Sequence, residues 1–414
     1  MRENLTELAT PPTKVKPSLR FGLSEWSGAV GDLGTTLPLA FALIVYNGFP
    51  VERILFLWGL VYLATGYFYR IPVSVQPLKA MAVLAISLGF SWQQLSTTAF
   101  LYGVLFILLA STGMIDRLQR LFTQPLVRGI QLGIGLLLAA KALRLVSEKG
   151  FLLNGAREAL QQTLPLLSQP LANLLLVALL VVLLWFFQFQ KRFPLVLLLI
   201  AGGLALSLAL HLPVHWELYR GSPVKLTMPE WGFLLNAVVY LIIPQLPLTL
   251  GNAVYAAADA CHSFWPERAQ RVTPRRLAGS IGLSNLAIGL LGGFPICHGA
   301  GGIGAHAQFG GKTGGTTIIL GSVFVLLALA EPLSSFLFFI PVPILAAMLL
   351  ADSWRMMSLL QRLRGRFPVV VALVVGGVSF FTRNLTLALL AGILLERGEA
   401  YLKKFIDQQK GESP

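Results

Sequence analysis

The residues best suited to chemistry lie in one glycine-rich segment, residues 292–315, which reads GGFPICHGAGGIGAHAQFGGKTGG. His298 and His306 lie eight residues apart, which is about two helical turns, so a helix here would bring them to nearly the same face. A helix that begins at a glycine-rich break presents unpaired backbone N–H groups and a positive dipole end, and both favour an anion. The pattern indicates an anion site with His298 as a candidate ligand; a histidine that only packs is the alternative.

Metal chemistry at these histidines is not supported. The segment contains no HExxH motif, and no cysteine or carboxylate supplies a third ligand at the spacing of zinc sites. The two cysteines, Cys261 and Cys297, show neither metal-site spacing nor a disulfide framework. We therefore expect no metal, no cofactor and no catalytic residue, and we expect that the chain is not an enzyme.

A second segment of the same kind is residues 71–82, IPVSVQPLKAMA. Pro72 and Pro77 prevent a continuous helix, so the segment predicts an extended break followed by a short helix. Gln76 offers amide donors there, and Lys79 offers a positive charge. Lys79 has three candidate roles: facing an anionic substrate, pairing with Asp32, or extending from a helix end towards the membrane surface.

Further polar residues lie in two apolar stretches. Asp32, in SGAVGDLGTTLPLAFAL, would cost roughly 2.5–3.5 kcal/mol near the centre of a bilayer, so a partner is expected. It either couples a proton or organises a site; the alternatives are that it caps a helix or forms an ion pair near the cytoplasmic interface. Gln245, Thr249 and Asn252 add neutral hydrogen-bonding groups. The whole set donates more hydrogen bonds than it accepts, as an oxyanion requires, whereas a cation site would need more carboxylates.

The composition is that of a membrane protein. Hydrophobic residues form 55% of the 414 residues and charged residues 12%, with a mean hydropathy of +0.73, about half the charge of a soluble domain. Recurrent apolar runs near the length of a membrane-spanning helix predict an all-α polytopic fold of roughly 14 spans in the lipid bilayer. The net charge of +14 fits basic loops on one face of such a protein, so no nucleic-acid partner is expected.

The distribution of Lys and Arg places both termini in the cytoplasm. A polar connection divides the chain into two apolar halves, and halves with an odd number of spans would be inverted relative to each other, a common transporter design. Each half then carries one short half-helix after a break, at the third and tenth spans, and we expect residues 71–82 and 292–305 to meet near the middle of the membrane. The predicted divisions are a cytoplasmic tail (1–20), a first repeat (21–212), an extracytoplasmic linker (213–230), a second repeat (231–405) and a cytoplasmic tail (406–414).

Three motifs carry a resemblance to a known family. GDLGTTLPLAFAL, PVSVQPLKAMAVLAIS and GGFPICHGAGGIGAHAQFGGKTGGT resemble the molybdate transporter family, a branch near the sulfate permeases, across nearly the whole apolar part of the chain. The resemblance implies two inverted repeats of seven spans, a core and a gate domain, and often a homodimer. It implies a substrate site formed by Asp32, Thr35, Gln76, Lys79, Gln245, His298, Gly299, Ala300, Gly301 and Gly302.

The resulting hypothesis is a secondary active transporter that imports molybdate, with sulfate as the alternative substrate, across the plasma (inner) membrane by alternating access. We expect proton coupling, with Asp32 and His298 as the candidate coupling residues. Where nucleobase permeases carry an acidic residue after the second break, this chain has Ala300 or Gly301, which favours an anion. A nucleobase or bicarbonate carrier, an anion channel and an intramembrane enzyme are the alternatives, and the sequence does not separate molybdate from sulfate or tungstate.

Overall fold

The computed structural model describes residues 18–152, 156–187, 195–212, 217, 220–330 and 336–409. The predicted N-terminal tail, the linker and the C-terminal tail therefore lie wholly or partly outside the described residues. Within the described part the chain is mostly helical, with one short pair of strands. The helical fold class is as predicted, and the strands form at the two predicted breaks.

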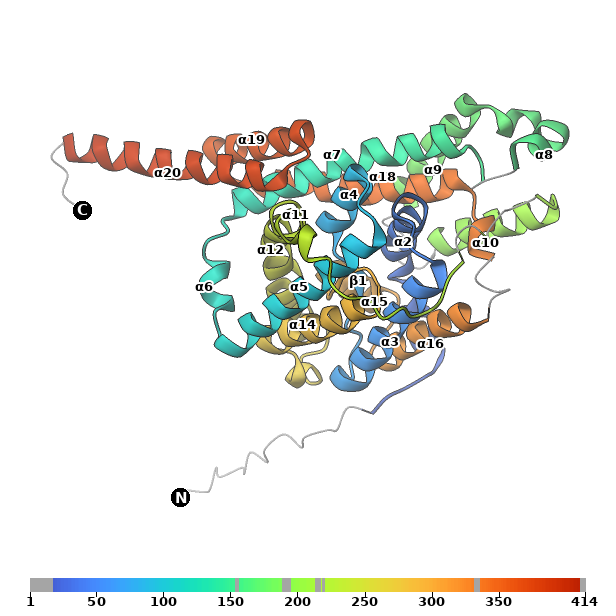
Figure 1. Ribbon diagram of the computed structural model, residues 1–414, viewed down its shortest axis with the longest axis horizontal. Helices are drawn as coiled ribbons and strands as arrows, with labels where there is room; N and C mark the ends of the chain where they lie inside the picture. The colour runs from blue at the N-terminus through green and yellow to red at the C-terminus, as the bar shows by residue number, and fades with distance from the viewer. Residues whose placement is uncertain are drawn as a thin grey trace, which may run out of the picture.

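Most helices belong to one of two groups, which Figure 1 shows one above the other. We call the larger group the α4–α15 block: α1 (Leu23–Val30), α2 (Leu33–Asn47), α3 (Val51–Tyr69), α4 (Lys79–Leu88), α5 (Trp92–Thr112), α11 (Leu234–Asn236), α12 (Ile243–Leu248), α13 (Ala256–Phe264), α14 (Pro274–Leu290), α15 (Ala300–Gln308) and α16 (Gly315–Leu329). We call the other the α7 layer: α7 (Gln124–Lys149), α9 (Pro170–Phe187), α18 (Val342–Ser358), α19 (Arg366–Thr382) and α20 (Leu385–Gln409). Peripheral helices are α6 (Ile115–Gln119), α8 (Ala156–Thr163) and α10 (Leu195–Ala209).

Helices from the two parts of the chain pack in matched pairs. In the α4–α15 block, α3 packs against α16 and α5 against α14; in the α7 layer, α7 packs against α18 and α19, and α18 also packs against α9. α3 and α14 each precede one of the two strands, and α5 and α16 each follow one of the two short helices. In both pairs, therefore, the helix before one break packs against the helix after the other break. This correspondence is the arrangement expected of two related repeats.

Six helical stretches among the described residues are long and apolar enough to cross a membrane: Val51–Tyr69, Trp92–Thr112, Gln124–Lys149, Pro170–Phe187, Trp231–Phe264 and Val342–Arg362. Shorter apolar helices, including Gly315–Leu329 and Arg366–Thr382, accompany them. The chain is thus a multi-pass membrane protein, and the number of about 14 spans stays a prediction.

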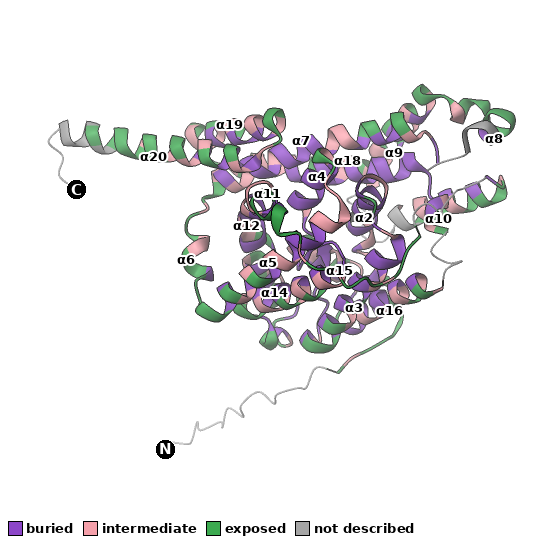
Figure 2. Ribbon diagram, in the orientation of Figure 1, coloured by how far each residue is buried: buried purple, intermediate pink, exposed green. Residues whose placement is uncertain are grey.

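The surface of α9 fits contact with lipid. Its mean hydropathy is 2.6, and only 17% of that stretch is buried. Large apolar side chains such as Leu175, Val182 and Phe186 are exposed on it, which in water would form an unusual apolar patch. Figure 2 shows the opposite situation around β1, α4 and α15, where buried residues concentrate at the centre of the molecule. Polar residues at that centre are therefore enclosed by protein.

The stretch around Gln245 is one long helical segment that contains two π-helical turns. π-Helical turns, η4 (Ala237–Ile242) and η5 (Thr249–Tyr255), flank α12 on both sides. Pro244 and Pro247 lie in α12 and remove backbone donors from the helical ladder. The wider π-helical turns accommodate this loss, and such turns occur often at functional sites.

Candidate functional site

The two predicted breaks meet at the centre of the α4–α15 block. β1 (Gln76–Pro77) pairs antiparallel with β2 (Ile296–Cys297), with Gln76 opposite Cys297 and Pro77 opposite Ile296. Next to this pair, the backbone N–H of Leu78 donates to the carbonyl of Pro295 over 3.1 Å. The prediction that residues 71–82 and 292–305 meet is confirmed by these contacts.

Side chains from neighbouring helices satisfy the backbone around β2. The carboxamide of Asn285 on α14 accepts from the N–H of Ile296 over 2.7 Å and donates to its carbonyl over 2.8 Å. Trp58 Nε1 donates to the carbonyl of Phe294, and Ser96 Oγ donates to that of Gly293. Buried backbone groups need such partners wherever the helix ends. The sequence analysis did not identify Asn285, and its only signal was a polar residue in an apolar run.

Each break leads directly into a short helix. α4 begins at Lys79 and has 10 residues, and α15 begins at Ala300 and has nine. A 10-residue helix is about 15 Å long, roughly half of the 30 Å hydrocarbon layer of a bilayer. Neither helix start has a capping hydrogen bond from its N-cap side chain, Leu78 or Gly299. First-turn N–H groups at both starts are therefore left without partners in their own helices.

The three glycines at the start of α15 differ in their surroundings. A Cβ at Gly299 would lie 2.2 Å from Gln76 Oε1, and a Cβ at Gly302 would lie 2.6 Å from Asp32 Oδ1. A Cβ at Gly301 would meet nothing within 4 Å, and Gly301 is exposed. Gly299 and Gly302 therefore allow close packing of polar side chains, whereas Gly301, next to the half-buried Ala300, faces open space.

Asp32 is the centre of a buried polar cluster. Its Oδ1 accepts from Gln76 Nε2 over 2.5 Å, and its Oδ2 accepts from the hydroxyl of Tyr62 over 2.7 Å. His306 Nε2 lies 3.7 Å from the same Oδ2, and both side chains are fully buried. Asp32 occupies the N-cap position of α2 but makes no capping hydrogen bond with its side chain. The Asp32 side chain therefore holds this polar cluster together and does not cap the helix.

Lys79 does not pair with Asp32. Its Nζ lies 3.0 Å from both carboxylate oxygens of Asp352 on α18, so its ion pair connects the α4–α15 block to the α7 layer. Of the three roles considered for Lys79, pairing with Asp32 is wrong, since Lys79 pairs with Asp352 while the oxygens of Asp32 accept from Gln76 and Tyr62. Sequence reasoning missed Asp352, which lies in an apolar helix but close to the basic loop that follows it.

Gln245 touches the start of α4. Its Oε1 accepts from the backbone N–H of Met81 over 3.2 Å, and its Nε2 donates to Thr249 Oγ1 over 3.0 Å. The hydroxyl of Tyr102 donates to the same Thr249 oxygen over 2.7 Å. Gln245 therefore holds one of the first-turn donors of α4 and is itself held in place.

His298 is bound by protein on both ring nitrogens. Nδ1 lies 2.9 Å from the carbonyl oxygen of Ser74, and Nε2 lies 2.8 Å from Ser280 Oγ. The ring is fully buried and packs edge-on against Tyr69. His298 therefore joins the first break to α14, and direct contact with an anion would require the loss of one of these hydrogen bonds. Thr35 lies in the first turn of α2, and its side chain lies outside the described residues.

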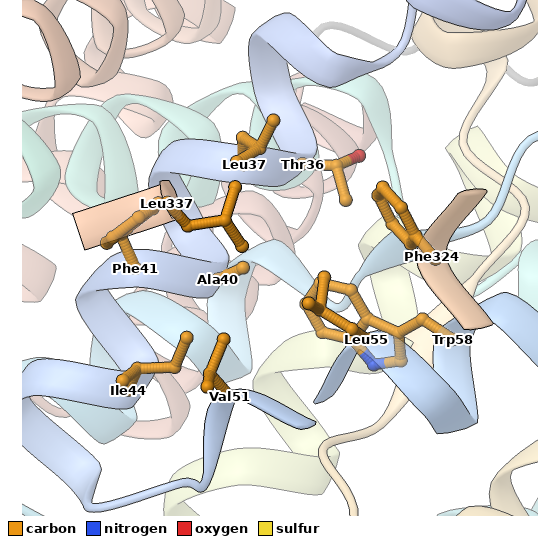
Figure 3. Close-up of a pocket in the computed structure, with 10 residues that line it drawn as sticks. All are labelled: Thr36, Leu37, Ala40, Phe41, Ile44, Val51, Leu55, Trp58, Phe324 and Leu337. Atoms are coloured by element: carbon orange, nitrogen blue, oxygen red, sulfur yellow. The ribbon is translucent and has the colours of Figure 1, made fainter. Parts of the chain in front are cut away.

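A cavity nearby is unsuited to an anion. Figure 3 shows its lining from α2, α3, α16 and the 3-10 turn η7 (Phe336–Phe339), and Thr36 contributes the single hydroxyl among the labelled residues. The other lining residues are apolar: Leu37, Ala40, Phe41, Ile44, Val51, Leu55, Trp58, Phe324 and Leu337. A charged guest would lose its hydration there without replacement.

Among the described residues, no group of three or more His, Cys, Asp or Glu side chains is placed to hold a metal ion.

Known proteins of similar sequence are transporters. This chain is 27% identical over 407 residues to Molybdate transporter 2 of Arabidopsis thaliana, covering 90% of this chain and 86% of that protein. It is also 27% identical over 470 residues to Molybdate transporter 1 of Chlamydomonas reinhardtii, covering 90% of each.

Solved structures of anion transporters share the fold. The transmembrane domain of a cyanobacterium bicarbonate transporter, BicA, aligns with a TM-score of 0.62 at 18% identity and covers 89% of this chain and 96% of that one. Murine Slc26a9, an anion transporter in the inward-facing state, aligns with a TM-score of 0.66 at 14% identity, covering 92% and 69%. At these identities the likeness establishes the fold alone.

The family model described as "Molybdate transporter of MFS superfamily" matches residues 24–138 and 237–356. The first block contains α4 and its break, and the second contains α15 and its break. Because the matches are to transporters, the prediction that the chain is not an enzyme is confirmed. The model matches more than half of the chain, and the protein therefore belongs to the molybdate transporter family.

Proposed function

We propose that this protein imports molybdate across the plasma membrane and that the oxyanion binds between the starts of α4 and α15. The observation that carries the proposal is the convergence on the β1–β2 pair of two helix starts whose N-cap residues make no side-chain hydrogen bond, in a chain of the molybdate transporter family. Backbone N–H groups and aligned dipoles at helix starts favour a tetrahedral anion. The open side of Gly301 gives the guest access to the start of α15.

In this proposal the site residues have different roles. Gly299, Ala300, Gly301 and the first residues of α4 present amide hydrogens, and Lys79 supplies positive charge. Gln76 and Gly302 connect the anion to Asp32, while Gln245 and His298 hold the two helix starts in position. Thr35, in the first turn of α2, completes the proposed set.

The proposed mechanism is alternating access. The two groups of helices correspond to the core and gate domains, with the α4–α15 block as the core and the α7 layer as the gate. The matched packing of α3–α16 and α5–α14 supports two inverted repeats, and movement of one group against the other would expose the anion to each side in turn. The Lys79–Asp352 ion pair crosses the boundary between the groups and would break or re-form in this movement.

Accumulation of a dianion needs an energy source. Moving charge against a negative-inside potential costs about 2.3 kcal/mol per charge per 100 mV, so we propose that protons accompany the anion.

Further parts of the proposal are a location in the plasma membrane with both termini in the cytoplasm, supported by the loop charges, and a homodimer as in many family members. Protease access to a terminal tag in sealed inside-out and right-side-out vesicles tests the orientation.

Uptake of labelled molybdate into proteoliposomes tests the function. We expect saturable uptake that is competed by unlabelled molybdate and sulfate, and counterflow when the vesicles are preloaded with molybdate. A channel would not show counterflow. Competition by bicarbonate or uracil, with none by either oxyanion, would overturn the substrate assignment.

A further inference from the structure

The imidazole of His306 has one nitrogen whose protonation state is fixed by its neighbour. Nδ1 lies 2.8 Å from the carbonyl oxygen of Gly28 on α1. A carbonyl oxygen only accepts, so Nδ1 carries a hydrogen and donates it. The other nitrogen, Nε2, has no hydrogen-bond partner within normal distance among the described residues, although it lies 3.7 Å from Asp32 Oδ2.

This geometry is unfavourable without an additional proton. A neutral ring with hydrogen on Nδ1 directs the Nε2 lone pair towards a carboxylate oxygen, and two acceptors would then face each other in a site closed to water. Both side chains are fully buried. A proton on Nε2 gives an imidazolium–carboxylate pair, and a proton on Oδ2 gives a carboxylic acid that donates to the ring. Either arrangement removes the conflict.

We propose that Asp32 and His306 together hold one exchangeable proton, and that this pair is the proton-binding site of the transporter. The inference rests on the proposed function, since it identifies where the coupled proton binds. No covalent bond between heavy atoms changes: the proton comes from water on one side of the membrane and returns to water on the other. It assigns the proton to His306, and not to His298, as the partner of Asp32.

His298 provides the internal comparison. Its Nδ1 faces the carbonyl oxygen of Ser74, and its Nε2 faces the hydroxyl of Ser280, whose single hydrogen can go to Nε2 or to the carbonyl of Leu277. A neutral ring therefore satisfies both contacts of His298. The second nitrogen of His306 faces a carboxylate instead, and this difference selects His306 as the histidine that gains a proton.

The Asp32–His306 pair is connected to the proposed anion site through the side chain of Gln76 and through helix α15. Gln76 donates from Nε2 to Asp32 Oδ1. Its Oε1 lies against Gly299, only 2.2 Å from where a Cβ on that residue would be. Its carboxamide thus bridges the carboxylate and the start of α15. The same α15 carries His306 eight residues further along. With the proton bound the Asp32–His306 pair is neutral, and without it the pair is negative, so proton and oxyanion should favour each other's binding.

Other titratable groups lie on the elements around the pair. They are Tyr62 on α3, Cys297 on β2, Glu25 on α1, Lys79 with Asp352, and Asp259 and His262 on α13. Glu25 accepts from the backbone of Lys312 and Thr313 and from the Thr316 hydroxyl. Asp259 is exposed, and the ring of His262 contacts the carbonyl of Val272. The Asp32–His306 pair differs from these groups because a fully buried acid and a fully buried base face each other over 3.7 Å without a hydrogen bond.

Binding of labelled molybdate to the purified protein, measured from about pH 5 to 8, where histidine ordinarily changes charge, tests the inference. We expect uptake of one proton per bound molybdate in weakly buffered solution, and on the alkaline side an affinity that falls about tenfold per pH unit, as one linked proton requires. Asp32→Asn and His306→Gln should each abolish both effects. His306→Gln keeps an amide donor for Gly28.

Control variants and the wild type keep the test decisive. His262→Gln and His298→Gln should retain the pH dependence, whatever the second does to affinity. If wild-type protein binds molybdate without taking up a proton, or if both pair variants fold and keep the wild-type slope, the inference is wrong while the transport function stands. Failure of the wild type to bind molybdate or sulfate at any pH would overturn both. Size-exclusion chromatography and thermal unfolding report whether a variant is folded, and the wild-type proton count needs no variant.

Discussion

Lys79 and Asp352 lie 273 residues apart in the chain, yet Lys79 Nζ is 3.0 Å from both carboxylate oxygens. The lysine occupies the first position of α4, and the aspartate lies in α18 of the α7 layer. Asp352 is buried, whereas about a quarter of the Lys79 side chain is exposed. The positive charge of Lys79, which we propose to face the substrate, therefore already has the carboxylate of Asp352 as its partner. An incoming oxyanion must compete with that carboxylate.

This competition predicts opposite effects for the two residues. Lys79→Met should weaken molybdate binding by about 10- to 100-fold, the value of a hydrogen bond to a charged group of roughly 1.5–3 kcal/mol. Asp352→Asn should instead strengthen binding several-fold, because it removes the competing negative charge. Titration calorimetry of the purified variants measures both. Weaker binding in Asp352→Asn with a normal melting temperature would show that Asp352 assists the anion and does not compete with it.

The glycines of α15 predict a graded series of alanine variants. Gly302→Ala places a methyl group 2.6 Å from both Asp32 Oδ1 and Ser74 Cβ, and such overpacking should destabilise the fold by about 1–3 kcal/mol. Gly301→Ala meets nothing within 4 Å, so it should fold normally but bind molybdate more weakly, since its methyl occupies the open side of the helix start. Thermal unfolding in detergent and molybdate binding separate the two effects.

Gly304→Ala is the matched control for this series. It lies on the same helix, and its nearest neighbour would be Phe264 at an ordinary contact distance of 3.9 Å. Stability and binding should both remain at the wild-type level. Equal loss of binding in the Gly301 and Gly304 variants would indicate a general effect on α15 and would remove the support for a guest at its start.

The breaks could be predicted from sequence because their causes are local, and their meeting followed from the expected inverted repeat. Prolines at 72, 77 and 295 and the glycines from 292 onwards exclude a continuous helix whatever surrounds them. The use of Asp32 and Gln76 as polar groups of the interior follows equally from the cost of placing them in lipid.

The partners of these residues could not be predicted because they depend on how distant helices pack. Lys79 was as compatible with Asp32 as with Asp352 until the oxygens of Asp32 were seen to accept from Gln76 and Tyr62. The two histidines looked similar in sequence, and only the groups that face their second nitrogens distinguish them. The number of spans stays a prediction, since several helices are shorter than a full crossing.

Asn285 should be essential to the stability of the second break. Replacement by Leu leaves the N–H and the carbonyl of Ile296 without their side-chain partners in an apolar interior, at about 1–3 kcal/mol for each group. We expect a clear fall in the midpoint of thermal unfolding. Asn285→Asp still accepts from the N–H but places a buried carboxylate opposite the carbonyls of Ile281 and Ile296, so it should lose at least as much, and a variant at the exposed Asn236 should lose nothing. An unchanged midpoint in Asn285→Leu would mean that the break does not depend on this carboxamide.

Gln245 offers a test of charge at the start of α4. Gln245→Glu keeps an oxygen to accept from the N–H of Met81, and a carboxylate is itself favoured at a helix start. A buried carboxylate still costs stability, and thermal unfolding measures that loss separately. The added negative charge lies beside the proposed oxyanion and should weaken molybdate binding by about tenfold or more, the equivalent of roughly 1.4 kcal/mol. Gln245→Leu, which removes the acceptor but adds no charge, should reduce stability more than affinity. If Gln245→Glu binds molybdate as tightly as the wild type, the anion does not lie near the start of α4.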